Sequence, residues 1–167
     1  TDIYKFAEYG EKGVLLLMSD STNALRKGYT RSESILSERL FEIFSSVRGR
    51  IIVATFASNI HRIQQVLDAA QKYNKRVVIS GITMLKNVEI ARSLGYLEYH
   101  DDLIIEVAEA NSLPEKKLVI ICTGSQGEPM SALSRMASNT HRHFAAGPGD
   151  TVIITASVIP GNERMVY

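Results

Sequence analysis

Five short runs of consecutive apolar residues limit most strongly how this chain can fold. Polar residues do not alternate with them, which is typical of strands buried on both faces of a parallel sheet. A weaker run at 103–105 predicts a short edge strand. The five main runs cover residues 14–18, 51–54, 77–79, 118–122 and 152–154.

Segments with helical periodicity separate most of these runs. A capping-box pattern at 30–33 precedes apolar residues spaced three and four apart up to Val47, and Gly49 predicts the helix end. Further helices are predicted from 60 to near 74 and from 84 to 94, and a fourth is predicted to begin at Pro129. Strands and helices that alternate with right-handed crossovers predict an α/β fold. We expect one three-layer, Rossmann-like domain over residues 1–167, with a mainly parallel central sheet between helices.

Composition narrows the class of protein. The 167 residues, 45% of them hydrophobic, can bury one core. With 19 Lys and Arg against 18 Asp and Glu there is no overall basic field, so nucleic acid would have to bind a local group of cations. The single Cys122 excludes an internal disulfide and indicates a cytoplasmic protein, and no apolar stretch approaches the ~20 residues that span a bilayer. Because the chain begins at Thr1 rather than Met, we expect a piece of a longer protein.

Small hydroxyl, amide and glycine residues follow each of the five predicted strands. Because ligands bind beyond the carboxyl ends of strands in open parallel sheets, these loops predict one binding edge. Glycines let a phosphate approach the backbone, and hydroxyls and helix amino termini attract it. The glycine spacing in 124–128 matches neither a P-loop nor a dinucleotide fingerprint, so an anion site is favoured without a specific ligand. The loops are 19–23, 55–59, 80–83, 123–128 and 157–162.

Asp20 is the acidic residue best placed for chemistry, because it follows a predicted buried strand. It could serve a metal ion or a histidine, or it could cap the turn that follows it. The four histidines are scattered, and no His-x-His-x-Asp-His motif occurs. A metal site needs three or four ligands, so we expect none in this chain.

Four segments carry a resemblance to a known family: 19–24 (SDSTNA), 56–65 (FASNIHRIQQ), 123–137 (TGSQGEPMSALSRMA) and 159–163 (IPGNE). They resemble the beta-CASP domain of bacterial ribonuclease J, and the likeness extends over essentially the whole chain. In that family the beta-CASP domain is inserted into a metallo-β-lactamase domain that supplies a two-zinc site. RNA passes between the two domains.

The resemblance implies a zinc-dependent 5′-to-3′ exonuclease and endonuclease that acts on RNA with a 5′-monophosphate end. Asp20 matches an acidic motif position that supports catalytic histidines, and the loop 125–128 matches a glycine-rich loop that faces RNA. We expect a Gly127→Val change to weaken RNA binding while leaving the melting temperature nearly unchanged. The residues predicted to bind RNA or phosphate are Ser21, Thr22, Asn23, Ser58, Asn59, Arg62, Ser125, Gln126, Gly127, Glu128 and Asn162.

The resemblance places zinc in the longer parent only, so the present chain alone is expected to be inactive. Its expected partners are RNA and its own metallo-β-lactamase domain, and a second copy or other RNA-decay proteins are further candidates. Two other classes stay open from the residues themselves. One is a free-standing α/β module that binds a phosphate or nucleotide, and the other is a structural or dimerisation domain whose loop hydroxyls only cap helices.

Overall fold

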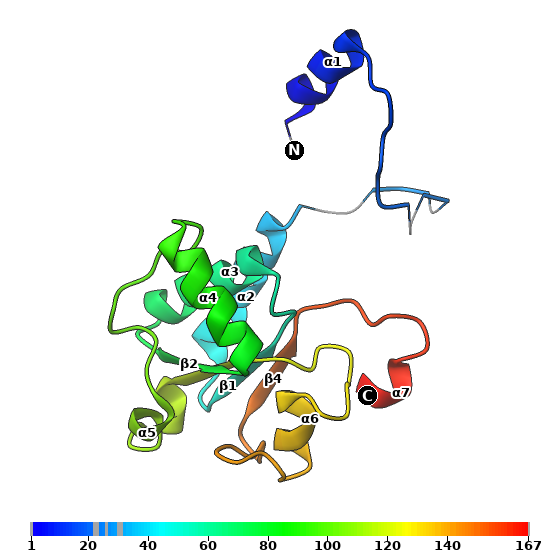
Figure 1. Ribbon diagram of the computed structural model, residues 1–167. Coiled ribbons are helices and arrows are strands. Elements are labelled where there is room, and N and C mark those ends of the chain that lie inside the picture. The colour runs from blue at the N-terminus through cyan, green and yellow to red at the C-terminus, as the bar shows by residue number, and fades with distance from the viewer. Residues whose placement is uncertain (1, 22–23, 26, 30–31, 167) are drawn as a thin grey trace. The chain divides into compact units, whose positions relative to one another are not determined.

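The computed structural model describes residues 2–21, 24–25, 27–29 and 32–166 (Figure 1). The chain divides into two compact units, Thr1–Arg31 and Ser32–Tyr167. The first unit contains α1 (Ile3–Lys12), whose amino end is capped by the Asp2 carboxylate accepting from the Lys5 N–H at 3.1 Å. Every residue that is described in this unit is exposed. The hydrophobic core therefore belongs to the second unit.

A four-stranded, all-parallel sheet forms the centre of the second unit. Its strands are β1 (Ile51–Ala54), β2 (Arg76–Ser80), β3 (Leu118–Cys122) and β4 (Thr151–Ile154), in the order β2-β3-β1-β4. All four coincide with apolar runs in the sequence, so these strand predictions are confirmed. The carboxyl ends of β3, β1 and β4 lie next to one another as a result of this order.

Helices cover both faces of the sheet, as Figure 1 shows. Alternate strand residues point to opposite faces, so Ile51 and Val53 join one core cluster while Ile52 and Ala54 join the other. The first cluster is completed by α2 (Ser34–Ser46), α3 (Ile60–Lys72) and α4 (Ile82–Ser93). The second is completed by α5 (Val107–Ala110), α6 (Ala132–Ala137) and Phe144. This arrangement confirms the predicted three-layer α/β sandwich.

Two short elements complete the unit, a 3-10 helix η1 (Glu115–Lys117) and α7 (Glu163–Val166). The left-handed cap predicted at Gly95 agrees with the structure, and α3 ends near Asn74 as predicted. Gly49 is not a cap, because α2 ends at Ser46 with Val47 as its C-cap. Asn74, after α3, has φ 51°, and Gly95, after α4, has φ 75°. Thr30 and Arg31 of the predicted capping box lie outside the described residues, and α2 begins at Ser34.

Three predicted elements differ from the structure. Residues 14–18 are not a buried strand but an irregular, exposed segment, because an apolar run does not by itself supply a neighbouring strand. Residues 103–105 make only an isolated bridge between Ile104 and Val77. The helix expected from Pro129 begins at Ala132, since the Ser131 hydroxyl caps it by accepting from the Ser134 N–H.

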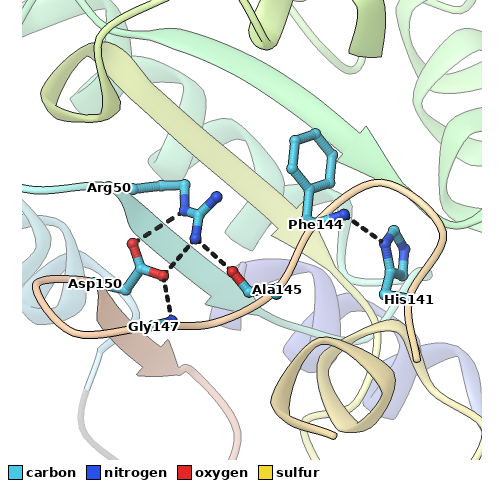
Figure 2. Close-up of polar contacts among 6 residues, drawn as sticks. All are labelled: Arg50, His141, Phe144, Ala145, Gly147 and Asp150. Carbon is cyan, nitrogen blue, oxygen red and sulfur yellow. Dashed lines mark hydrogen bonds and ion pairs between the residues drawn. The ribbon is translucent and has the colours of Figure 1, made fainter. Parts of the chain in front are cut away.

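The starts of β1 and β4 are joined by a buried ion pair, shown in Figure 2. Arg50 donates to both carboxylate oxygens of Asp150, from Nε at 3.0 Å and from Nη2 at 2.5 Å. The same Nη2 donates to the Ala145 carbonyl at 2.6 Å, and Asp150 also accepts from the Gly147 N–H at 2.9 Å. The pair thus holds both β4 and the loop that leads into it.

Candidate functional site

The loops that follow β1, β3 and β4 form one surface, which we call the loop surface. It comprises residues 55–59, 123–128 and 155–162. Hydrogen bonds cross from loop to loop: the Gln126 side-chain amide donates to the Ser157 carbonyl at 3.0 Å and its oxygen accepts from the Ile159 N–H at 2.8 Å. The loop after β4 is therefore held against the glycine-rich loop after β3.

Gln126 and Ser125 are buried, with 3% and 1% of their surfaces exposed. The nitrogen and the oxygen of the Gln126 amide each make one of the bonds that join the two loops, and the Ser125 hydroxyl has no hydrogen-bond partner among the described residues. The Glu128 carboxylate accepts from the Gln126 N–H at 3.1 Å, although the residue is exposed. The Gln126 side chain thus holds two loops of the loop surface together by hydrogen bonds, whereas the sequence predicts that it contacts RNA.

Gly127 is needed for a contact inside the protein. Its φ is 71°, and a Cβ atom built on it would collide with the backbone of Met165 in α7. The open side of this glycine is therefore occupied by protein. This finding corrects the expectation that a side chain at position 127 would leave the melting temperature nearly unchanged.

Arg62 also has a different role from the predicted one. Only 3% of the residue is exposed, and its guanidinium donates to the Thr155 carbonyl at 2.7 Å and pairs with Glu33. It fastens α3 to the end of β4 and to the start of α2. A buried guanidinium with these partners cannot turn to an RNA phosphate without losing them, so the structure does not support Arg62 as a phosphate contact.

Asn59 is the N-cap of α3, because its side-chain oxygen accepts from the Arg62 N–H at 3.1 Å. Ser58 beside it is exposed, and Asn162, which precedes α7, is half-buried. Two cationic or titratable residues in the helices that follow these loops were not selected from the sequence. His61 is exposed in the first turn of α3, and Arg164 is exposed in α7.

Four predicted site residues lie in or next to the gap at 22–23. Asp20 and Ser21 belong to the first unit, and Ser21 is exposed and its carbonyl accepts from the Ala24 N–H at 3.0 Å. Thr22 and Asn23 lie outside the described residues. Of the predicted site residues, those that the structure brings together in the loop surface are thus 58–59, 125–128 and 162.

The chemistry available on the loop surface is that of hydrogen bonding. Within the described part of the chain, no three His, Cys, Asp or Glu side chains gather as metal ligands would. These residues do not fit a zinc site, so we derive no step through zinc.

Cys122 is buried in β3, and burial raises its pKa to about 12, which makes it a poor nucleophile. Among the described helices, none is long and apolar enough to cross a membrane.

Comparisons with known proteins agree with the resemblance. The family model described as the beta-CASP domain of ribonuclease J matches residues 48–167. A protein named Ribonuclease J from Helicobacter pylori strain 26695 is 48% identical over 166 residues, which are 99% of this chain and 24% of that protein. The Thermus thermophilus protein of the same name is 49% identical over 97% of this chain and 28% of its own length. Ribonuclease J2 from Bacillus subtilis 168 is 43% identical over 99% of this chain and 30% of its own. The chain thus spans less than a third of the length of these relatives.

Proposed function

Because this chain belongs to the family of ribonuclease J beta-CASP domains, we propose that it is the RNA-positioning part of a ribonuclease and that the loop surface contacts the RNA. The observation that carries the proposal is that Gln126 joins two of these loops, the one after β3 and the one after β4. This joining gives a binding surface that is formed before RNA arrives. A surface that needs no ordering on binding loses less conformational entropy.

The donors on the loop surface, and Arg164 in α7 directly after it, suit a phosphate-sugar backbone. Ser58 offers a hydroxyl, Asn59 and Asn162 offer side-chain amides, and Arg164 offers a permanent charge. Neutral hydrogen bonds contribute only about 0.5–1.5 kcal/mol each, so affinity should come from several weak contacts with one or two cations. The nearly balanced charge of the chain is consistent with such a local footprint.

In the longer protein, we propose that an adjoining metallo-β-lactamase domain holds zinc and carries out hydrolysis. Zinc in such sites lowers the pKa of bound water and so supplies a hydroxide at neutral pH. RNA with a 5′-monophosphate end is the proposed substrate, and both exonuclease and endonuclease activity are proposed for the parent. The present chain would bind RNA without cleaving it.

RNA binding can be tested by fluorescence anisotropy with a labelled, 5′-phosphorylated single-stranded RNA at low salt. We expect Arg164→Gln to weaken binding several-fold and to reduce the salt slope by about 0.7, the loss of one phosphate contact on a single strand. Arg48→Gln is the matched control, because Arg48 is exposed just before β1, at the opposite end of the strands. Equal losses in both variants, or no binding by the wild-type chain, would contradict the assignment.

A further inference from the structure

Besides the loop surface, the structure has a cavity of about 400 Å³ at the carboxyl ends of β2 and β3. We call it the second cavity. Its walls come mainly from the start of α4, from α6 and from the segment 141–144, and Thr123 is the lining residue that it shares with the loop surface. The volume lies within the range of small-molecule sites, about 300–1,000 Å³. The polar lining residues are Ser80, Thr83, Thr123, Arg135, His141 and His143.

The lining carries cationic charge without a counter-ion. None of the described residues that line the cavity is acidic. The half-buried Arg135 has no ion pair or side-chain hydrogen bond with any residue that the structure describes, and its Nε is a buried donor without a partner. Buried donors and charges are costly unless they are paired. An anion in the cavity would supply the missing acceptor.

His141 has a defined tautomer, which decides what Ser80 can do. Its Nδ1 lies 3.2 Å from the Phe144 N–H, a contact drawn in Figure 2, and 3.3 Å from the His143 N–H. A nitrogen that accepts from two backbone donors carries no proton, so the neutral ring is protonated at Nε2. That Nε2–H donates to the Ser80 hydroxyl oxygen at 3.1 Å. His141 therefore cannot act as a base for Ser80, and the Ser80 proton is available to donate to a ligand.

The segment that carries both histidines is fixed at its two ends. At one end the His141 ring accepts from the backbone, and at the other Arg50 and Asp150 hold Ala145 and Gly147 (Figure 2). Donors that are held in place before binding give tighter and more specific complexes. The cavity is thus a preformed set of donors rather than a gap between mobile loops.

We propose that this cavity binds a phosphate monoester, with Arg135 as the charge partner and the hydroxyls of Ser80 and Thr83 and the ring of His143 as further donors. The first residues of α4 also line it, and their backbone N–H groups add partial positive charge. Free phosphate and the phosphate of a nucleotide share this chemistry. The apolar wall, which includes Val107, Met130 and Phe144, offers a nucleoside a surface to pack on.

Calorimetric titration of the 167-residue chain with inorganic phosphate, AMP and adenosine tests the proposal. Phosphate and AMP should bind and adenosine should not. AMP binding tighter than phosphate identifies a nucleotide as the ligand, whereas equal affinities identify the phosphate group alone. Arg135→Gln should weaken both by about tenfold or more, the usual loss for a hydrogen bond to a charged group.

Arg142→Gln is the matched control, since Arg142 lies between the two histidines but is exposed and does not line the cavity. It should change affinity less than twofold. Thr83→Val, at an exposed position, should weaken phosphate binding without risk to the fold. Absence of phosphate and AMP binding, equal binding of adenosine, or equal losses in Arg135→Gln and Arg142→Gln would overturn the proposal. RNA binding at the loop surface should be unchanged in Arg135→Gln, so the two proposals can fail separately.

Discussion

At the scale of single residues, several polar or flexible positions that suggest ligand binding serve the protein's own structure. Gln126 and Arg62 are both predicted phosphate contacts, yet each uses its side chain to join two segments. The residue types that bind phosphates are the same ones that satisfy buried backbone groups. Residue type alone therefore does not distinguish a ligand contact from a contact inside the protein.

Gly127→Ala is expected to lower the free energy of unfolding by about 2 kcal/mol or more, because the left-handed φ and the Met165 backbone both oppose a side chain. Gly147→Ala is the matched control, since a Cβ there meets no atom within 4 Å. Denaturant unfolding of the two variants provides the measurement. Equal stability would mean that α7 moves away from Gly127 at little cost.

Burial, with Arg135 and His143 next in effect, lowers the pKa of His141. As the pH falls, His141 therefore takes up a proton in the unfolded chain before it does so in the folded chain. The contribution of neutral His141 to the free energy of unfolding is fully present above the ordinary pKa of about 6.5, and it is lost as the pH falls from there through the lower pKa of the folded chain. Unfolding free energies between pH 8 and pH 5, in phosphate-free buffer, should fall less steeply in His141→Gln. His61→Gln, at an exposed position in α3, is the matched control. Parallel curves for all three proteins would contradict this origin of the pH dependence.

At the scale of elements, strand order decides which loops can cooperate. The order β2-β3-β1-β4 separates the carboxyl end of β2 from those of β1 and β4. The loop after β2 consequently lines the second cavity together with Thr123 at the end of β3, while the loops after β3, β1 and β4 form the loop surface. One sheet edge thus carries the two surfaces for which we propose different ligands.

Asp150→Asn is expected to cost about 3 kcal/mol, because it leaves the largely buried Arg50 guanidinium without its counter-charge. The side chains of Arg50 and Asp150 are only 12% and 4% exposed. Glu42→Gln, which breaks the exposed pair between α2 residues Arg39 and Glu42, should cost under about 1 kcal/mol. Urea unfolding measures the loss of unfolding free energy in each variant. Comparable losses in the two variants would show that the Arg50–Asp150 pair does not stabilise the position of β4.

At the scale of the whole molecule, the chain consists of a core-bearing unit and a unit without buried residues in its described part. The apolar residues at 14–18 are all exposed. Exposed apolar stretches of this kind favour association with another surface. Their presence is consistent with a chain that spans less than a third of its relatives.

A chain of residues 32–167 should therefore melt within a few degrees of the 167-residue chain, since the deletion removes no described core residue. It should also self-associate less. Sedimentation velocity on the two chains, and on the full chain with Leu15→Lys and Leu17→Lys, measures this difference. A large drop in melting temperature, or self-association that is unchanged by both alterations, would contradict the prediction.

Asp20→Asn in the longer protein should fold normally but lose about 10–100-fold in ribonuclease activity, the usual effect of removing a carboxylate that orients a metal-bound or catalytic histidine. Zinc content, melting temperature and turnover on 5′-phosphorylated RNA should be measured together. Wild-type turnover with intact zinc would show that Asp20 only forms the turn before residues 22–23.

The sequence by itself determined the α/β class, the four core strands and the three long helices that pack on them, because continuous apolar runs and apolar residues three and four apart reflect local geometry. It also identified the family, because the amino-acid sequences of four loop segments are characteristic of that family. Only the tertiary structure decided that residues 14–18 lie outside the sheet, that Arg62, Gln126 and Gly127 contact protein, and that Arg135, Ser80 and His141 meet at one cavity. These outcomes depend on partners distant in sequence, such as Thr155 for Arg62 and Met165 for Gly127, and no local pattern encodes them.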